Sequence, residues 1–152
     1  MQGALTPIRQ ATAEDIPAIL NLEKQIAEIA HWPEDAYHTA FATNAPERLI
    51  LLAGNESALF GFLTARFSFA ECELENIAVA PAQRRHGIGS QLLGRLIANG
   101  RERKTEKIFL EVRESNRAAR NLYQTCGFVE IGRRKAYYLN PPDDALLFAL
   151  TL

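Results

Sequence analysis

Apolar and polar residues follow one another along this chain with two different periods. Between Ile16 and Ile26 apolar side chains recur three and four positions apart, as on one helix face, and Thr12-Ala13-Glu14-Asp15 before them resembles a capping box. Other segments, such as residues 59–69, have the apolar runs of strands. The pattern predicts, in order, a strand at Ile8, helices over 16–26 and 34–42, strands over 49–53, 59–69 and 73–79, a helix from Ile88, a strand over 108–112, a helix capped by Ser115 or Asn116, and strands over 128–131 and 146–150.

Glycine, proline and asparagine mark the ends of these elements. His31-Trp32-Pro33 separates the first two helices, and Asn44-Ala45-Pro46 ends the second. Asn99-Gly100 predicts the end of the third helix, and Gly127 closes the fourth. Residues 140–144 suit a hairpin loop rather than a linker. The resulting order, β-α-α-β-β-β-α-β-α-β-β, predicts an α/β fold in a single domain over residues 1–152.

Composition and charge exclude several classes of protein. The 152 residues are 47% apolar and 23% charged, and no apolar run approaches the roughly 18 residues that span a bilayer. The net charge of −1 does not favour direct nucleic-acid binding, although Arg84-Arg85-His86 and Arg133-Arg134-Lys135 are local basic patches. Cys72 and Cys126 lack metal-ligand spacing, the histidines are unpaired, and no signal peptide opens the chain. We expect a cytoplasmic protein without a metal or a membrane partner.

The segment Arg84-Arg85-His86-Gly87-Ile88-Gly89-Ser90 predicts a phosphate-binding site. It follows the apolar run Asn76-Ile77-Ala78-Val79 and opens a helix, so unpaired backbone amides and the positive end of the helix dipole meet there. The two glycines allow the backbone to approach an anion closely. The P-loop and dinucleotide-binding patterns both fit badly, so a nucleotide of another kind is indicated.

This element order, with R-x-x-G-x-G from Arg84 to Gly89, resembles the GNAT N-acetyltransferase superfamily over nearly the whole chain. The segments 111–116 (Glu-Val-Arg-Glu-Ser-Asn), Leu122-Tyr123 and 126–128 (Cys-Gly-Phe) resemble the signature of its RimI family of ribosomal-protein alanine N-acetyltransferases. Trp32-Pro33 and Tyr137-Tyr138 agree with that family. The resemblance implies a single GNAT domain with a mixed, mostly antiparallel sheet flanked by about four helices.

The resemblance also implies acetyl-coenzyme A as the donor substrate. Its diphosphate is expected on Arg84, Arg85, His86, Gly87, Ile88, Gly89 and Ser90, and its pantetheine arm against the backbone of Ile77, Ala78 and Val79. An amide-containing arm can hydrogen-bond the exposed edge of a strand like an added strand. The family assigns Asn116 a further coenzyme A contact, for which the alternative is simply a helix N-cap.

Acetyl transfer to an amine needs a base for the amine and an acid for the departing thiolate. Glu111 interrupts the apolar run 108–112, and the family uses this glutamate as the base; the alternative is a carboxylate paired with Arg113 or Arg120. Tyr123 follows Asn116 by seven positions on the same helix face, and the family assigns it the acid. The alternative for Tyr123 is a core aromatic.

Glu73 and Glu75 complicate the choice of base. If their strand is regular, both share a face with Ile77 and Val79, and other GNAT enzymes place a base on this strand. Glu75 is therefore the second candidate base, with a role in binding the acceptor ammonium or a salt-bridged strand face as alternatives.

Trp32 and Tyr137 are candidates for the acceptor groove, with a gap-filling role over the core as the alternative. Cys126 is interpreted as a small buried hydrophobe, without a covalent intermediate.

Three functional hypotheses follow. The first is an N-acetyltransferase that modifies the α-amino group of a protein N-terminus, with a ribosomal protein as the partner implied by the resemblance, working as a monomer or weak dimer. The second keeps the fold and the donor but acetylates a small amine such as a polyamine, amino acid or aminoglycoside, which acidic Glu73 and Glu75 favour. The third is a non-catalytic module that binds acetyl-coenzyme A or a partner.

Overall fold

The computed structural model describes residues 5–27, 29–42 and 47–152. Its elements are, in chain order, β1 (Ile8–Gln10), the 3-10 turn η1 (Ala13–Asp15), α1 (Ile16–Glu23), α2 (Glu34–Ala40), β2 (Arg48–Gly54), β3 (Leu59–Ser68), β4 (Glu71–Val79), the 3-10 turn η2 (Pro81–Gln83), α3 (Ile88–Glu102), β5 (Lys107–Arg113), α4 (Arg117–Thr125), β6 (Val129–Tyr138) and β7 (Asp143–Thr151). The strands form one sheet in the order β1-β2-β3-β4-β5-β7-β6. All neighbours are antiparallel except β4 and β5, which are parallel.

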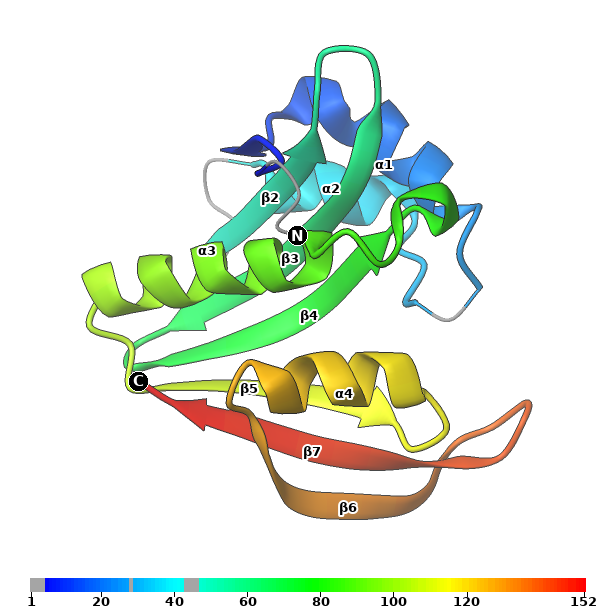
Figure 1. Cartoon of the computed structure of the whole chain (residues 1–152), viewed down its shortest axis with the longest axis vertical. Helices are drawn as coiled ribbons and strands as arrows, with labels where there is room; N and C mark the ends of the chain where they lie inside the picture. The colour runs from blue at the N-terminus through cyan, green and yellow to red at the C-terminus, as the bar shows by residue number, and fades with distance from the viewer. Residues whose placement is uncertain (1–4, 28, 43–46) are drawn as a thin grey trace.

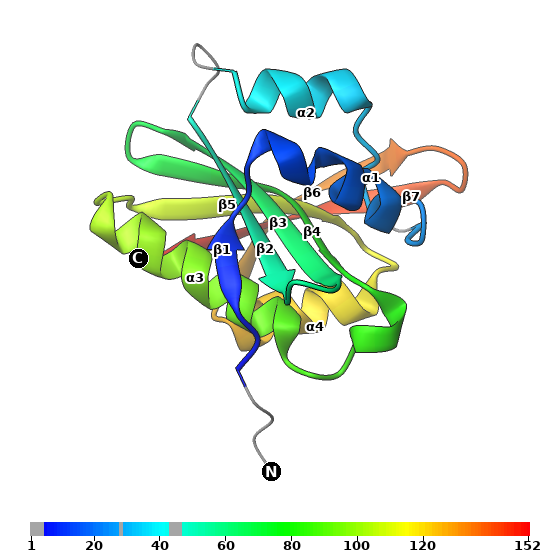
Figure 2. The ribbon, with the colours of Figure 1, turned by 90° about the horizontal axis from the view of Figure 1, so that it is seen from above.

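The predicted fold class is confirmed. The described strands and helices follow one another as the periodicity predicted, and the sheet is mixed and mostly antiparallel. Helices α1 and α2 lie on one face of the sheet, and α3 and α4 lie on the other (Figures 1 and 2). The sheet is therefore the middle layer of three, and either face can carry part of a site.

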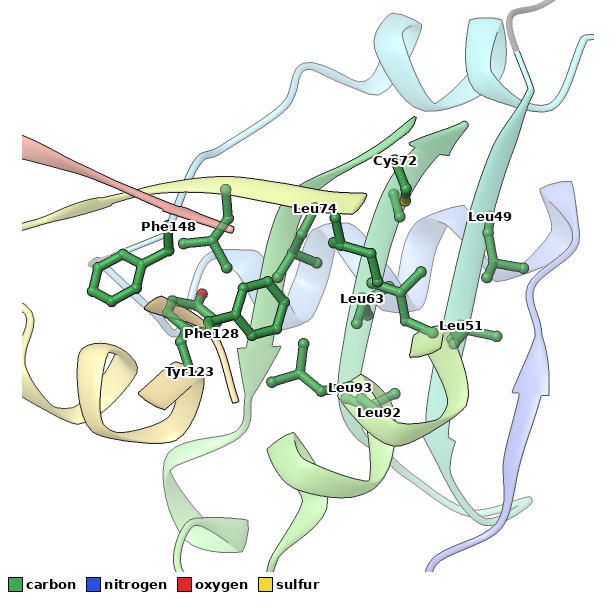
Figure 3. Close-up of a cluster of buried hydrophobic side chains, with 14 of the residues drawn as sticks. Leu49, Leu51, Leu63, Cys72, Leu74, Leu92, Leu93, Tyr123, Phe128 and Phe148 are labelled. Carbon is green, nitrogen blue, oxygen red and sulfur yellow. The ribbon is translucent and has the colours of Figure 1, made fainter. Parts of the chain in front are cut away.

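Each face has its own apolar core. On the face of α3 and α4, Leu92 and Leu93 pack with residues such as Leu63 and Phe148, all fully buried (Figure 3). On the opposite face the α1 stripe, including Ile16, packs on strands β2, β3 and β4. Because that second core includes no residue of β5, β6 or β7, these three strands carry no helix on the α1 and α2 face (Figure 1).

The predicted end of the third helix at Asn99-Gly100 is two residues too early, because α3 continues to Glu102. Gly100 serves packing instead. A Cβ atom there would lie 2.9 Å from a methyl group of Leu152. The chain leaves the helix at Lys104, whose φ of 61° is in the left-handed region. The second helix ends at Ala40, and the predicted stop at residues 44–46 falls on residues 43–46, outside the described part of the chain.

The predictions for β4, β6 and β7 are too short. β4 begins at Glu71 rather than Glu73, and the closing hairpin is longer than expected because β6 continues to Tyr138 and β7 begins at Asp143. Residues 132–138 are mostly polar and exposed, so their side chains give no apolar signal, whereas backbone pairing with β7 holds them in the sheet. A hairpin loop forms where residues 140–144 predicted one, but Asp143 and Asp144 belong to β7.

Asp15 ties the start of α1 to β1. Its carboxylate accepts the Thr12 N–H at 2.8 Å, as the predicted capping box requires, and pairs with the Arg9 guanidinium at 2.7 Å. The Arg9 hydrogen bond is the largest cause that lowers the pKa of Asp15, to about 2.

Replacing Asp15 with Asn should lower the free energy of unfolding by about 1 kcal/mol at pH 7, since a cap is weakened and a solvent-screened ion pair is lost. The folded-state pKa lies below the unfolded value of about 3.9, so this stabilisation is complete above pH 5 and disappears as the pH falls towards 2. Urea unfolding of both proteins at pH 7 and pH 3 measures it. An equal difference at the two pH values would contradict the assignment.

Candidate active site

Strands β4 and β5 part halfway along their length. Their parallel ladder joins only Glu71 to Lys107, Cys72 to Ile108, and Glu73 to Phe109. Beyond that point a central cavity of about 310 Å³ opens between the strands, while β4 stays paired to β3 up to Val79. The cavity is lined by Ala27, Ile29, Ala30, Leu74, Glu75, Asn76, Ile77, Leu110, Glu111, Val112, Arg113, Asn116, Ala119, Tyr123 and Tyr138.

A β-bulge at Glu75 changes which face the β4 side chains occupy. Thr64 pairs with Asn76 and Ala65 with Leu74, so Glu75 is an extra residue on β4. Leu74 and Ile77 consequently both pack towards α3 and α4, although they are three positions apart. The prediction that Glu73 and Glu75 share the face of Ile77 and Val79 is therefore wrong, because it assumed a regular strand.

The bulge also places Asn76 against the α1–α2 connection. Its side-chain amide donates to the Ala30 carbonyl oxygen at 2.8 Å. This bond fixes the segment that follows α1 beside the central cavity.

The predicted phosphate site lies next to this cavity. A groove of about 560 Å³, the cradle, runs along β4 from Ile77 to Val79 and past the N-terminus of α3. Gly87 caps that helix with a φ of 76°, where a side chain is disfavoured. The β4 edge that faces the cradle has no β5 partner, and an extended ligand can pair with such an edge. The Val79 carbonyl oxygen on this edge accepts the Arg84 Nε–H at 3.4 Å. The predicted residues that line the cradle are Ile77, Ala78, Val79, Arg84, Arg85, Gly87, Ile88, Gly89, Ser90 and Asn116.

His86 is the predicted cradle residue that does not line it. Its ring Nδ1 lies 3.1 Å from the Gln83 carbonyl oxygen, so the imidazole packs on the preceding turn.

The position of Asn116 is compatible with both of its interpretations, a helix N-cap and a coenzyme A contact. Its side-chain oxygen accepts the Ala119 N–H at 3.2 Å as the N-cap of α4, and the residue lines both the cradle and the central cavity.

Gly87→Val should weaken the binding of an anionic ligand at the cradle. A β-branched residue at this φ is strained, by roughly 1–2 kcal/mol, and the loop would shift to relieve it. We expect the dissociation constant of coenzyme A, measured by calorimetry, to rise about tenfold. Gly94→Ala is the matched control on the same helix, since nothing lies within 4 Å of the Cβ position there. Equal affinities of the two variants would contradict this role for Gly87.

Glu111 lies on β5 at the point where the strands part. Its neighbours Leu110 and Val112 point into the α3 and α4 core, so its carboxylate points to the opposite face. The side chain is 32% exposed, and the Arg134 guanidinium lies 3.4 Å from its Oε1. The expected alternative partners are engaged elsewhere: Arg113 stacks on Tyr138, and Arg120 donates to the Glu114 carbonyl.

Tyr123 reaches the same cavity from α4. Its ring packs on Phe128 and Phe148, with centroid separations of 5.9 and 6.3 Å (Figure 3). The side chain is buried, and burial raises its pKa well above the usual 10. A phenol in such a place stays protonated at neutral pH. Tyr123 is thus a core aromatic that also lines the central cavity.

Glu75 is held in an ion pair. The Arg48 Nε and Nη2 atoms lie 3.0 and 2.9 Å from its two carboxylate oxygens, and both side chains are largely buried. The guanidinium of Arg48 in turn stacks on Trp32, 5.2 Å from the ring centroid. Trp32 packs against the α1 core beside Tyr37, so it contributes to the core while bordering the site.

The central cavity and the cradle adjoin, since Ile77, Asn116 and Ala119 line both. Together they present a helix N-terminus, a strand edge without a β5 partner, a carboxylate and a buried phenol. Comparison with known proteins agrees with this arrangement. The sequence description of the acetyltransferase (GNAT) family matches residues 14–128. The chain belongs to the GNAT acetyltransferase family.

Two relatives show the extent of the likeness. The acetyltransferase is 34% identical over 134 residues to the [ribosomal protein bS18]-alanine N-acetyltransferase of Haemophilus influenzae, covering 88% of each chain. It is 32% identical to the Escherichia coli protein of the same name, covering 97% of this chain and 99% of the relative.

Solved structures show the same fold. The crystal structure of the ribosomal-protein-S18-alanine N-acetyltransferase from E. coli matches with a TM-score of 0.86 and 30% identity, covering 97% of this chain and 94% of the other. Arabidopsis thaliana NAA60, solved in complex with acetyl-CoA, has the same fold with a TM-score of 0.83 at 16% identity, covering 97% and 99%.

In this acetyltransferase the closing hairpin presents a different tyrosine from the predicted one. Tyr138 lines the central cavity, whereas Tyr137 is 50% exposed and carries the Arg134 guanidinium over its ring at 5.5 Å. Tyr137 does not line the central cavity, and its place in the acceptor groove stays a prediction. The register of β6 against β7 shifts between Arg134 and Tyr138, and Ala136 has a φ of 50°, so simple alternation fails there.

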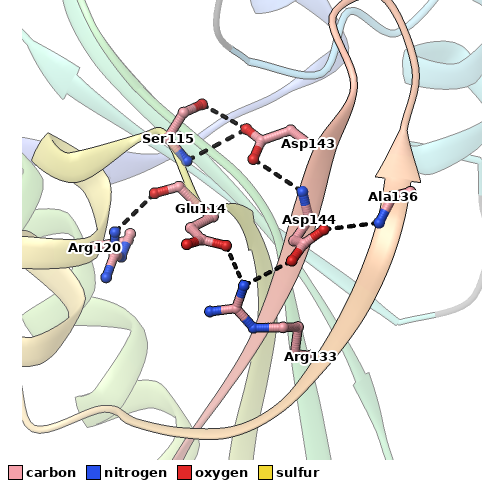
Figure 4. Close-up of polar contacts among 7 residues, drawn as sticks. All are labelled: Glu114, Ser115, Arg120, Arg133, Ala136, Asp143 and Asp144. Carbon is pink, nitrogen blue, oxygen red and sulfur yellow. Dashed lines mark hydrogen bonds and ion pairs between the residues drawn. The ribbon is translucent and has the colours of Figure 1, made fainter.

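A polar network fixes this hairpin to the end of β5 (Figure 4). The backbone N–H and hydroxyl of Ser115 donate to Asp143, and Arg133 bonds both Glu114 and Asp144. Asp144 also accepts the Ala136 N–H at 2.8 Å. The network precedes Asn116 directly, so it holds the hairpin of the acetyltransferase beside both the cavity and α4.

Sequence reasoning missed three residues that shape the site. Arg48 and Arg134 are the partners of the two candidate bases, and nothing local marks them. Glu23 is 3% exposed and accepts hydrogen bonds from the Trp32 N–H at 3.2 Å and from the Tyr37 hydroxyl. A signal for Glu23 existed, since it follows the buried Ile19 by four positions on α1.

No described helix of the acetyltransferase is long and apolar enough to cross a membrane.

Proposed function

We propose that this acetyltransferase transfers an acetyl group from acetyl-coenzyme A to the α-amino group of a protein N-terminus, with an alanine-initiated ribosomal protein as its acceptor. The observation that carries the proposal is that a carboxylate, Glu111, and a protonated phenol, Tyr123, line the same cavity at the end of the cradle. The names of the relatives above agree with it.

The residues present fit the donor. Arg84, Arg85 and the first amides of α3 would hold the diphosphate, and the β4 edge without a β5 partner would pair with the pantetheine arm. Asn116 borders both ends of that path. When bound, acetyl-coenzyme A supplies the acetyl thioester. The polypeptide then has to accept one proton from the amine and donate one to the departing thiolate.

Glu111 is our proposed base. Releasing a neutral amine at pH 7 costs about 1.4 kcal/mol for an α-amino group of pKa near 8, against about 4.6 kcal/mol for a lysine near 10.4. A partly exposed carboxylate, acting directly or through one water, is adequate for the first task. The Arg134 guanidinium pairs with this carboxylate at 3.4 Å. The ammonium group of the acceptor would replace the guanidinium beside Glu111.

Tyr123 is our proposed acid. The phenol stays protonated at neutral pH because burial raises its pKa, and a thiolate that forms in the same apolar surroundings is also destabilised as a charge and so takes up the proton. The rings of Phe128 and Phe148 fix the direction of the hydroxyl.

The second candidate acceptor, a small polycationic amine, loses its main support. Glu75 is already neutralised by Arg48, and Glu73 pairs with Arg66 at 2.9 Å, so the two acidic residues do not form an unpaired anionic site. The surroundings of Trp32 and Tyr138 instead offer apolar area beside the cavity.

An acceptor screen tests the proposal. Thiol release from acetyl-coenzyme A is measured with Ala-, Ser- and Met-initiated peptides, beside polyamines and free lysine. Selective turnover of the Ala-initiated peptide supports the proposed function. Turnover confined to small amines contradicts the proposed function. Binding of acetyl-coenzyme A without thiol release for any acceptor would favour a non-catalytic module.

A further inference from the structure

A second groove continues from the central cavity along the open face of the sheet. This lateral groove has a volume of about 440 Å³ and shares Leu110 and Glu111 with the cavity. It runs along the stretch where β4 and β5 are still paired, so the sheet forms its floor. It lies on the face that α1 and α2 leave uncovered over β5, β7 and β6.

The floor of the lateral groove near Glu111 is built of apolar side chains, beside the Arg134 guanidinium that also lines the groove. Phe109 lies two residues before Glu111 on the same face of β5, and Leu147 of β7 stands in register with Glu111. Ile131 adds a side chain that is 55% exposed. Glu130 pairs with Phe148 and Gly132 with Leu147, so Ile131 is the extra residue of a β-bulge, a feature that re-aims a side chain.

An acceptor polypeptide has to leave the central cavity on a side that the donor substrate does not occupy. Its amine must reach Glu111, while the donor substrate takes the cradle on the other side. The wall beside β4 is closed by the Arg48–Glu75 ion pair under Trp32. The lateral groove is open and starts at Glu111 itself.

We propose that the polypeptide following the acetylated residue lies extended in the lateral groove and packs an apolar third side chain on Phe109, Ile131 and Leu147. This inference rests on the proposed function. An extended chain advances about 3.3 Å per residue, so a first residue at Glu111 brings the third about 6.6 Å along, level with Phe109. The polar far end of the groove, with Arg66, Glu71 and Glu73, then faces residues beyond the third.

The test compares kcat/KM for pentapeptides with the sequences Ala-Ala-Leu-Ala-Ala and Ala-Ala-Ser-Ala-Ala, beside the dipeptide Ala-Ala. Burying about half of a leucine side chain should raise kcat/KM for the first pentapeptide about tenfold over the second, through a lower KM. Ile131→Lys should remove this preference and leave the dipeptide unchanged. Val129→Lys is the matched control: Val129 is a 61% exposed residue of the same strand outside the groove, and its substitution should keep the preference.

Two failures are distinguishable. Turnover of the dipeptide without a leucine preference, or an equal effect of Ile131→Lys on the dipeptide and the pentapeptides, overturns the lateral groove and leaves the proposed function standing. Absence of turnover with every peptide, while a small amine is acetylated, overturns both.

Discussion

Glu111→Gln lowers kcat for an Ala-initiated peptide by about 10²–10³-fold, because the amide cannot accept the proton of the attacking amine. Gln has nearly the shape of Glu, and Glu111 is a partly exposed strand residue, so the fold and the affinity for acetyl-coenzyme A should be retained. The residual rate of the variant should rise with pH as the α-amino group loses its own proton near pH 8. Steady-state kinetics from pH 6 to pH 9 measure both effects.

Glu75→Gln separates the two candidate bases. Glu75 lines the same cavity but is paired with Arg48, so its substitution should reduce stability and affect kcat far less than Glu111→Gln. A large loss of kcat in Glu75→Gln with a small one in Glu111→Gln would make Glu75 the base.

Tyr123→Phe lowers kcat by about 10–10²-fold with little change in the dissociation constant of acetyl-coenzyme A. Only the hydroxyl is removed, so packing on Phe128 and Phe148 persists and the melting temperature should stay close to that of the unmodified protein. The loss arises because the departing thiolate no longer receives a proton from the buried phenol. Single-turnover rates with saturating donor isolate this step from product release.

Tyr138→Phe is the matched control, since Tyr138 lines the same cavity from the closing hairpin. We expect its kcat to fall by less than about threefold. If Tyr138→Phe is the slower variant, the hydroxyl of the hairpin, and not that of α4, supplies the proton.

The order of elements could be predicted because each depends on local signals. The stripe that includes Leu92, Leu93 and Leu96 is fully buried on α3, as its spacing requires. The glycine pattern of the cradle was equally informative, since a left-handed residue at Gly87 leaves a direct trace in the sequence. The positions of Glu111, Tyr123 and Asn116 on one cavity follow from the family resemblance and are compatible with the structure.

The two bulges could not be predicted. An extra residue at Glu75 or Ile131 leaves the composition of its strand unchanged and appears only when the strand is paired with its neighbour. Each bulge nevertheless decides which side chain faces the site. The same limit explains why Tyr138, and not Tyr137, reaches the cavity.

Ion pairs between residues far apart in the sequence could not be predicted either. Arg48 is 27 positions from Glu75 in sequence, and only the neighbouring of β2, β3 and β4 brings the two together. The ion pair changes the interpretation of the acidic strand from a cation-binding surface to a neutral wall of the cavity. Charge in the sequence alone could not show this.

The site of acetylation on a single peptide tests the central claim most directly. An Ala-initiated peptide that also contains one lysine is incubated with the protein and acetyl-coenzyme A, and fragment mass spectrometry locates the added acetyl group. We expect acetylation of the α-amino group alone, and its loss in Glu111→Gln. Acetylation of the lysine side chain alone, or an α-amino product that Glu111→Gln forms at an unchanged rate, would contradict it.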